Sequence, residues 1–364
     1  MLFEIQRDIF FDGLSKTVPI AEKRSPLPIL SHVLLDAGEA QVTLTATDLE
    51  VGLQTIHEGD VKETGRVTLP SRKVLEIVRE LPGGLVTVQS IGEGRIKIIA
   101  GESMFELAGM DPADYPAWSS FEQIKPVAVE AEKLIDMIEK TSFASSSDES
   151  RFNLNGILFE WREDKNRLVA TDGHRLALMD GELGLGLEPS VLVPKKSLNE
   201  LRRILENVQG EILLGFEEKN LVVRTDRFTM TLRLIDGEYP DYTKVIPKSG
   251  DKILTTDRMR LLQALKRVAI LTSDRNRGIN MSVAPGRMEL TASHQDLGAA
   301  RDVVEVDYKD EEFSLIINVA YLIEALGVVD TETISIEYIK EGAPVIIRPH
   351  PVKDYFNLVM PMRN

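Results

Sequence analysis

The 364-residue sequence contains no cysteine, which excludes disulfides, thiolate metal sites, cysteine nucleophiles and iron–sulfur ligation. It also lacks an apolar run long enough for a membrane-spanning helix. The first residues, MLFEIQRDIFFDG, carry acidic side chains where a secretory signal peptide has basic ones. A cytoplasmic protein with no membrane partner is therefore expected.

Positive charge is in the minority, because 43 Lys and Arg residues face 58 Asp and Glu residues, for a net charge of −15. Such a protein repels phosphate backbones on average, although a local basic surface can still attract them. The apolar share of 43% is ordinary for a globular chain. At about 100 to 200 residues per domain, the length allows two or three domains.

The sequence contains an internal repeat. Three apolar phrases, LTATDLEVGLQ, LVATDGHRLAL and LTASHQDLGAA, place Asp48, Asp172 and His294 at matching positions. A second series aligns Pro70, Pro194 and Asn318 at the same spacing of about 124 residues, and the phrases that end at Pro116 and Pro240 agree with it. The repeat predicts three similar domains, 1–120, 121–244 and 245–364.

Each repeat predicts two helices and several strands. After Pro70, Ser71 is placed to cap a helix whose apolar residues are Val74, Leu75, Val78 and Leu81. Helical spacing recurs after Pro194 and over 258–269, whereas 94–100 and 221–227 alternate like strands. The fold class is therefore α+β, with two helices packed on antiparallel sheets in each domain.

Basic residues gather on predicted helices although every repeat is acidic overall. One exposed face carries Lys196, Asn199 and Arg203, and the predicted helix 258–269 has a similar face. A charged helical face is most often simply solvated. Its recurrence at equivalent positions also fits a track for a polyanion, and charge alone leaves both interpretations open.

Four phrases carry a resemblance to a known family. They are LPIL from Leu27, TATDLEV from Thr45, TDGHRLAL from Thr171 and VMPMR from Val359. Together they resemble the bacterial DNA polymerase III β subunit, the sliding clamp. The resemblance covers the whole chain, and TDGHRLA and the MPMR end are its most specific parts.

The resemblance implies a protein without catalysis, in which each copy forms half of a ring and two copies join head to tail to close it around duplex DNA. Helices would lie inside and sheets outside, and six similar domains would supply the rotation that closes the ring. Such a ring needs phosphate attraction without base readout. Seven residues on or beside segments similar to the family's inner helices and loops are predicted to bind DNA: Arg24, Lys73, Arg79, Lys195, Lys196, Arg202 and Arg203.

The resemblance also implies a pocket for short extended peptides from the DNA polymerase III catalytic subunit, the clamp loader and other replication and repair proteins. An apolar lining that includes Met suits varied partners, because thioether side chains repack easily. The predicted pocket residues are Leu154, Thr171, Gly173, His174, Arg175, Leu176, Pro240, Lys244, Val245, Pro344, Leu358, Val359, Met360, Pro361, Met362 and Arg363. Lys244 and the final Asn364 depart from the family's common Arg and Leu.

The resemblance further implies a junction between the two copies that uses Phe105 and Leu107 on one side and Ile270 and Leu271 on the other. Apolar residues at a strand edge invite pairing, so a closed interface is a sensible use for them. Ordinary core positions are the alternative interpretation for these four residues.

Two rival functions deserve comparison. A hydrolase that uses His174 with Asp172 lacks any nucleophile or phosphate-binding motif, and the matching phrase TATDLE has no histidine. The five histidines are scattered without metal-ligand spacing, so no metal or cofactor is expected. A repeat-built scaffold that binds peptides without encircling DNA remains an open alternative.

Overall fold

The structure is a computed structural model of the chain. It describes residues 1–21, 26–92, 94–119, 121, 124–186, 190–217, 219–247, 252–273, 277–351 and 354–362. Predicted sites Arg24 and Arg363 lie outside these residues. In the described part of the chain, none of the helices combines the length and the apolar character needed to cross a membrane.

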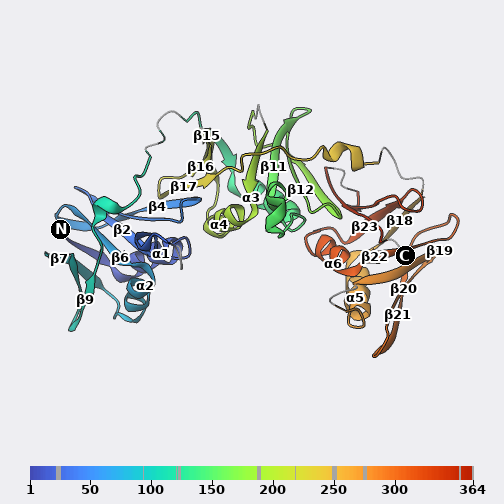
Figure 1. The fold of residues 1–364 in the computed structure, drawn as a ribbon, viewed down its shortest axis with the longest axis horizontal. Coiled ribbons are helices and arrows are strands. Elements are labelled where there is room, and N and C mark those ends of the chain that lie inside the picture. The colour runs from blue at the N-terminus through green and yellow to red at the C-terminus, as the bar shows by residue number, and fades with distance from the viewer. Residues whose placement is uncertain are drawn as a thin grey trace. The chain divides into compact units, whose positions relative to one another are not determined.

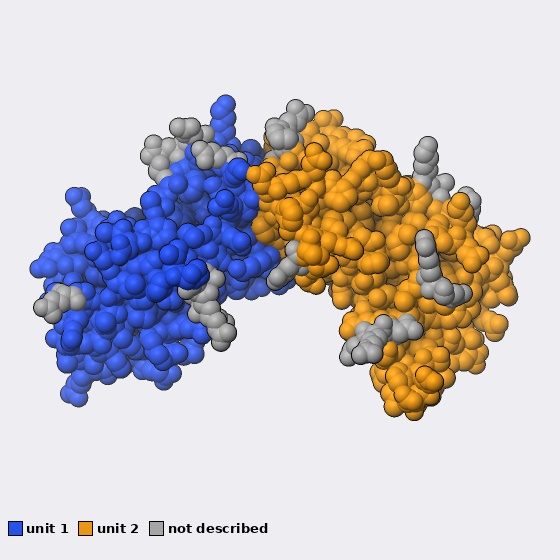
Figure 2. Space-filling view, viewed as in Figure 1, with its two compact units in different colours: residues 1–131, 196–234 blue, residues 132–195, 235–364 orange. Residues whose placement is uncertain are grey.

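The chain forms two compact units, coloured separately in Figure 2. Unit 1 comprises 1–131 and 196–234, and unit 2 comprises 132–195 and 235–364. The division follows strand pairing, so the middle predicted domain contributes strands to both units.

The described part of unit 1 has three α-helices: α1 (Arg7–Thr17), α2 (Ser71–Glu80) and α4 (Lys195–Leu205), whose first residue falls in unit 2. Short 3-10 turns are η1 (Pro28–Ser31) and η2 (Pro112–Asp114). The strands are β1 (Leu2–Gln6), β2 (His32–Ala37), β3 (Gln41–Thr47), β4 (Val51–Glu58), β5 (Asp60–Glu63), β6 (Gly65–Pro70), β7 (Leu85–Gly92), β8 (Arg95–Ala100), β9 (Ser103–Ala108), β10 (Val127–Glu130), β15 (Glu211–Glu217), β16 (Asn220–Arg224) and β17 (Phe228–Arg233).

Unit 1 contains two antiparallel sheets. One has the strand order β5-β1-β7-β8-β9, and the other has the order β10-β15-β16-β17-β4-β3-β2-β6. The longer sheet joins strands of two repeats, since β4 pairs with β17 through Leu53 opposite Met230. Helices α1 and α2 pack together, and Phe10, Leu14 and Val74 lie in the core cluster that they share with the sheets (Figure 1).

The prediction that Ser71 caps α2 is wrong. Ser71 is the first helical residue, and the side chain of the preceding Pro70 makes no capping hydrogen bond. The Ser71 hydroxyl instead donates to the carbonyl oxygen of Ser31 at 2.8 Å. Its hydrogen bond therefore ties the start of the helix to a neighbouring segment, a tertiary contact that a local sequence pattern does not reveal.

The described part of unit 2 has the α-helices α3 (Ala131–Ser142), whose first residue falls in unit 1, α5 (Arg258–Ala269) and α6 (Val319–Gly327). The 3-10 turns are η3 (Glu149–Asn155) and η4 (Tyr242–Val245). Its strands are β11 (Gly156–Arg162), β12 (Lys165–Thr171), β13 (Arg175–Gly181), β14 (Val191–Pro194), β18 (Lys252–Asp257), β19 (Gly278–Ala284), β20 (Arg287–His294), β21 (Gly298–Glu305), β22 (Phe313–Asn318), β23 (Thr333–Tyr338), β24 (Val345–Pro349) and β25 (Tyr355–Val359).

Unit 2 also contains two antiparallel sheets, with the orders β14-β11-β12-β13-β25-β24-β23-β18 and β21-β20-β19-β22. Helix α5 begins cleanly because the side chain of Asp257 accepts the backbone N–H of Arg260 at 2.7 Å. Its residues Leu261, Leu265 and Val268 are buried, as the spacing predicted. Helix α6 is capped in the same way by Asn318, whose side chain accepts the N–H of Ala320.

The predicted repeat is visible in the element order. Pro70, Pro194 and Asn318 each end a strand directly before a helix, and the pattern of two helices per repeat is confirmed by α1 with α2, α3 with α4 and α5 with α6. Each repeat does not form one sheet, however. The first repeat divides its strands five and four between two sheets, and the second and third repeats divide theirs four and four, because strand edges of neighbouring repeats pair with each other.

Candidate functional site

The repeated phrases around Asp48 and Asp172 form the same tight turn between two strands. Asp48 Oδ1 accepts the N–H groups of Glu50 and Val51 at 3.0 and 2.7 Å. Asp172 Oδ1 accepts the N–H groups of the residues at the same offsets, His174 and Arg175, at 2.9 and 3.0 Å. These aspartates therefore hold the turn shape, which explains their recurrence without any catalytic role.

The geometry gives no support to a catalytic pair of Asp172 and His174. The second carboxylate oxygen of Asp172 accepts the Nε of Arg175 at 3.0 Å. His174 is exposed, and among the hydrogen bonds of the described residues it contributes only its backbone groups. The aspartate is thus occupied by the turn and by an arginine rather than orienting an imidazole.

Arg175 is the most heavily bonded side chain of the predicted pocket, with only 10% of its side chain exposed. Besides Asp172, its guanidinium donates to the carboxylate of Glu324 on α6 and to the carbonyl oxygen of Phe143. It also lies over the ring of Tyr321, 4.5 Å from the ring centre. Arg175 therefore fastens the turn to helix α6, and a charge enclosed by partners in this way resists displacement.

The pocket's apolar wall forms where β13 pairs with β25. Leu176 lies opposite Leu358, and Arg175 lies opposite Val359. Leu176, Leu358 and the partly buried Met360 belong to one apolar cluster. The N–H of Met360 donates to the carbonyl oxygen of His174 at 2.8 Å, so the chain end is held against the TDGHRLAL turn.

The remaining predicted pocket residues form a more open set. Pro240, Lys244 and Val245 are exposed, and Lys244 pairs with Asp241 at 3.2 Å. Gly173 donates its N–H to the hydroxyl of Thr171 at 3.1 Å. Leu154 lies in η3 and Pro344 precedes β24, and both are half-buried. The role of these outer residues in peptide binding stays a prediction.

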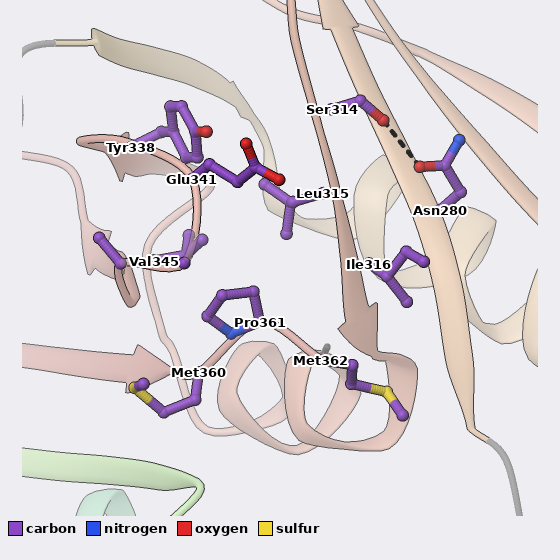
Figure 3. Close-up of a pocket in the computed structure, with 12 residues that line it drawn as sticks. Asn280, Ser314, Leu315, Ile316, Tyr338, Glu341, Val345, Met360, Pro361 and Met362 are labelled. Atoms are coloured by element: carbon purple, nitrogen blue, oxygen red, sulfur yellow. Dashed lines mark hydrogen bonds between the residues drawn. The ribbon is translucent and has the colours of Figure 1, made fainter. Parts of the chain in front are cut away.

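A groove adjoins this pocket at the chain end. It has a volume of about 510 Å³. Figure 3 shows polar side chains along one side of it and apolar side chains along the other. The residues that line it are Asn280, Ser314, Leu315, Ile316, Tyr338, Glu341, Gly342, Ala343, Val345, Met360, Pro361 and Met362. Its last three residues belong to the predicted peptide pocket, whereas the sequence offered no sign of the others.

The predicted DNA-binding residues differ in how far they are engaged. Lys73 and Arg79 are exposed on α2, where Lys73 pairs with Glu76 at 2.6 Å. Lys196 on α4 is 68% exposed and pairs with Asp48 at 2.8 Å. Both lysines keep most of their surface open to solvent, as a weak phosphate contact requires.

Lys195, Arg202 and Arg203 are only partly exposed. Burial lowers the pKa of Lys195, and the nearby charge of Arg175 lowers it further. Arg203 donates to Glu200 at 2.9 Å and to the carbonyl oxygen of Lys16 at 2.9 Å. Arg203 therefore also has a structural role, because its guanidinium donates to the carbonyl oxygens of Ser15 and Lys16 in the last turn of helix α1.

The predicted junction residues lie near sheet edges. Phe105, with 38% exposed, and Leu107 lie on β9, the end strand of its sheet. Ile270, with 74% exposed, and Leu271 follow α5, which packs on the end strand β21. Leu107 packs partly on the core, whereas the exposure of Phe105 and Ile270 does not fit ordinary core positions.

Sequence reasoning missed the partners of Arg175. Tyr321 and Glu324 come from α6, far along the chain from the turn that they hold. One signal was present, because Glu324 is the single charged residue in the otherwise apolar segment VAYLIEALG. An isolated charge on such a helix often indicates a buried partner. Its identity depended on tertiary packing.

Comparisons with known proteins cover the full chain. Family models of the DNA polymerase III beta subunit match its N-terminal domain at residues 1–119, its central domain at 128–241 and its C-terminal domain at 243–363. The beta sliding clamp of Pseudomonas putida is 34% identical over 366 residues, with 100% of both chains covered.

Two solved structures are also similar over 100% of both chains. The DNA polymerase III subunit beta of Pseudomonas aeruginosa has a TM-score of 0.95 at 33% identity. A sliding clamp of Bartonella birtlesii bound to griselimycin has a TM-score of 0.95 at 32% identity.

Proposed function

The chain belongs to the DNA polymerase III beta subunit family, the beta sliding clamps, and on this premise we propose that two copies close into a ring around duplex DNA. The protein is a processivity subunit and not an enzyme: it tethers the replicative polymerase to its template. We further propose that the three domains are 1–120, 121–244 and 245–364, and that the protein acts in the cytoplasm on the chromosome.

The ring proposal rests on one observation, the order of the strands. Each eight-stranded sheet joins four strands of one repeat to four strands of the next, through β4 with β17 in unit 1 and β13 with β25 in unit 2. The order of elements within each repeat makes β21 equivalent to β4 and β13, and it makes β9 equivalent to β17 and β25. Strands β9 and β21 instead end their sheets. A second copy supplies the missing partner for each, head to tail.

The register of this junction follows from the two joints within the chain. Tracing paired strands outward from each edge identifies equivalent residues. On the equivalent strands β17, β25 and β9, the equivalent residues are Met230, Asn357 and Phe105. On the equivalent strands β4, β13 and β21, they are Leu53, Ala177 and Ala300. Because Leu53 faces Met230 and Ala177 faces Asn357, we place Phe105 opposite Ala300 of the partner copy. The ring then buries the exposed Phe105 against a small residue, with Leu107, Ile270 and Leu271 nearby.

We assign the DNA contacts to the basic residues on and beside helices α2 and α4, together with Arg24. They hold phosphates weakly and read no bases, which permits sliding. Their support is the recurrence of cations on the equivalent helices α2 and α4 of an acidic protein, of which Lys73, Arg79 and Lys196 are exposed. The set is Arg24, Lys73, Arg79, Lys195, Lys196, Arg202 and Arg203.

We assign client binding to the pocket beside the TDGHRLAL turn. Clients are the polymerase III catalytic subunit, the clamp loader and other replication and repair proteins, each through a short extended peptide. Support comes from the apolar wall of Leu176, Leu358 and Met360, and from the open rim of Pro240 and Val245. The Bartonella birtlesii clamp was solved bound to griselimycin, which shows that a sliding clamp accepts a ligand.

Encirclement has a direct test. The protein is loaded by the clamp loader of the same bacterium onto a circular duplex, and half of the DNA is then cut once. We expect retention on the circle and loss from the linear ends, because only topology holds the ring. Equal retention on both would contradict encirclement and favour the peptide-binding scaffold. The molecular mass in solution should be twice that of the chain.

The pocket is tested by deleting residues 361–364. This deletion leaves β25 and the hydrogen bond from Met360 to His174 in place, so the fold should survive. We expect binding of polymerase-derived peptides to fall at least tenfold while the dimer mass is unchanged, since an anchor of an interface is lost. Unchanged peptide affinity would refute the pocket assignment.

A further inference from the structure

The groove next to the pocket offers a second binding surface, which we call the flank groove and define by Ser314, Ile316, Tyr338, Glu341 and Met362. We propose that the flank groove holds the stretch of client polypeptide that adjoins the segment in the peptide pocket, with a basic client side chain beside Glu341. This inference rests on the proposed function, since it requires that clients bind as extended peptides.

The flank groove is continuous with the peptide pocket. Met360, Pro361 and Met362 line the groove and are also predicted pocket residues. Figure 3 places Pro361 between the other apolar side chains of the groove. A client polypeptide that leaves the pocket over these residues therefore enters the groove directly. This continuity favours a flanking segment of the same client as the occupant of the groove.

One wall of the groove presents backbone groups suited to an extended chain. β22 is the end strand of its sheet, and the N–H of Met362 donates to Ile316 at that outer edge at 2.8 Å. Alternate residues of a strand face the same edge, so the N–H and carbonyl of Ser314 also point outward. The strand that pairs with β22 in the described sheet is β19, and it lies on the opposite edge. An added peptide strand satisfies such groups, as in β-augmentation.

The side chains of the groove divide into an apolar floor and a polar rim. Leu315 and Val345 are largely buried beneath it, whereas Ser314 donates to Asn280 Oδ1 at 2.7 Å along the rim. This division suits a peptide whose alternate side chains point down and out. The flank groove therefore matches an extended segment better than a compact ligand.

Glu341 sets the charge of this surface. It is exposed, and it is the only charged side chain among the described residues that line the groove. Glu341 lies beside Tyr338 in the groove lining (Figure 3). Burial raises the pKa of Tyr338, and the negative charge of Glu341 raises it further. A carboxylate beside an aromatic ring and an apolar floor attracts the long stem and charged head of Lys or Arg.

The experiment uses peptides from the polymerase III catalytic subunit of the same bacterium. Overlapping 15-residue peptides identify one that binds the whole dimer, and trimming reduces it to the shortest binding core. The core is then extended at either end with flanks that contain two Lys, two Glu or two Ala residues. At low salt we expect a Lys flank at one end to bind about three- to fivefold tighter than a Glu flank, the size of an exposed ion pair.

Two variants test Glu341 against a matched control. Glu341→Lys should reverse the flank preference while leaving affinity for the core unchanged. Glu312→Lys makes the same change of charge at an exposed residue outside the groove and should leave the preference as it is. A preference that survives Glu341→Lys, or that is absent in the natural protein, would overturn the proposal.

A second pair of variants tests the strand edge. Ser314→Pro removes the outward N–H, whereas Ser314→Ala removes only the hydroxyl. We expect Ser314→Pro to abolish the affinity that any flank adds, and Ser314→Ala to retain it. If the core itself fails to bind the dimer, the pocket assignment is at fault. If the core binds and both variants behave alike, only the flank groove is rejected.

Discussion

The first and second repeats solve one packing problem in opposite ways. In unit 1, the large side chain is His57 on strand β4 and the small one is Gly13 on helix α1: a Cβ at Gly13 would lie 2.4 Å from His57 Nε2. In unit 2, the equivalent helix residue is the large Met137, and the equivalent strand residue is Gly181, where a Cβ would lie 2.5 Å from Met137 Sδ. The pair has exchanged sizes.

The strand register makes this equivalence firm. His57 pairs with Val42, Gly181 pairs with Asn166 and, in the third repeat, Val304 pairs with Met288. The third repeat places Val304 in the same core cluster as Ala264 of α5, a pair of intermediate sizes. The repeats thus preserve the volume between helix and strand rather than the residues, because close packing tolerates exchanges that conserve volume.

The turns of the two repeats differ in another respect. At the position of Val51, which is buried, the second repeat has Arg175 with its partners on α6. In both turns the aspartate carboxylate accepts the N–H of the residue three positions further on. The comparison teaches that the shared fold supplies the turn, whereas a substitution on it supplies the contacts that join the second turn to α6.

The largest expected effect comes from Arg175→Ala. Removing this charge leaves the carboxylate of Asp172, which is only 14% exposed, without its partner, which should cost about 3 kcal/mol of the unfolding free energy; Glu324 is 45% exposed and adds little. Urea unfolding measures it, and peptide affinity should fall as well because the pocket wall loosens. A cost no greater than that of Val51→Ala would erase the distinction between the turns.

The pH dependence of unit 1 is the next effect. Burial lowers the pKa of His57 to about 4, against the attraction of Asp12, so the folded protein favours the neutral ring. The stabilisation is complete above the unfolded pKa near 6.5 and is lost as the pH falls toward 4, by about 3 kcal/mol in all. His57→Gln should flatten the unfolding free energy across that range. Equal slopes in both proteins would contradict the assignment.

The size exchange itself can be tested with a double-mutant cycle. Gly13→Met should destabilise unit 1 by about 1 to 3 kcal/mol, because the new side chain overlaps His57. His57→Ala in the same chain makes room, so the double variant should recover roughly 2 kcal/mol relative to the sum of the single changes. Simple additivity in urea unfolding would show that the two positions do not share one volume.

The smallest effect is expected at Lys196. Lys196 pairs with Asp48 of the first turn, as Arg175 pairs with Asp172 of the second turn, but the lysine side chain is 68% exposed. Lys196→Ala should therefore cost less than about 1 kcal/mol. The thermal midpoint checks this value. A loss as large as that of Arg175→Ala would mean that exposure does not separate the two sites.

Local patterns were sufficient for much of the fold. Leu198, Leu201 and Leu205 are buried on α4 as their spacing predicted, since helical periodicity is set within a few residues. The same local reasoning failed at Ser71, whose hydroxyl found a carbonyl oxygen 40 residues away. For the candidate site, the turn at Thr171 and the chain end at Met360 were predicted, whereas Glu341 and Ser314 were not, because the groove exists only where separate strands meet.

By itself, the sequence determined the number of repeats, the alternation of helices and strands and the acidic balance of the protein. These follow from spacing and composition, which do not depend on distant contacts. Only the tertiary structure decided that each repeat divides its strands between two sheets, that Arg175 joins the turn to α6, and that a groove continues from the peptide pocket. Such features arise because strand edges, charges and cavities are completed by residues remote in the chain, and packing alone selects which ones meet.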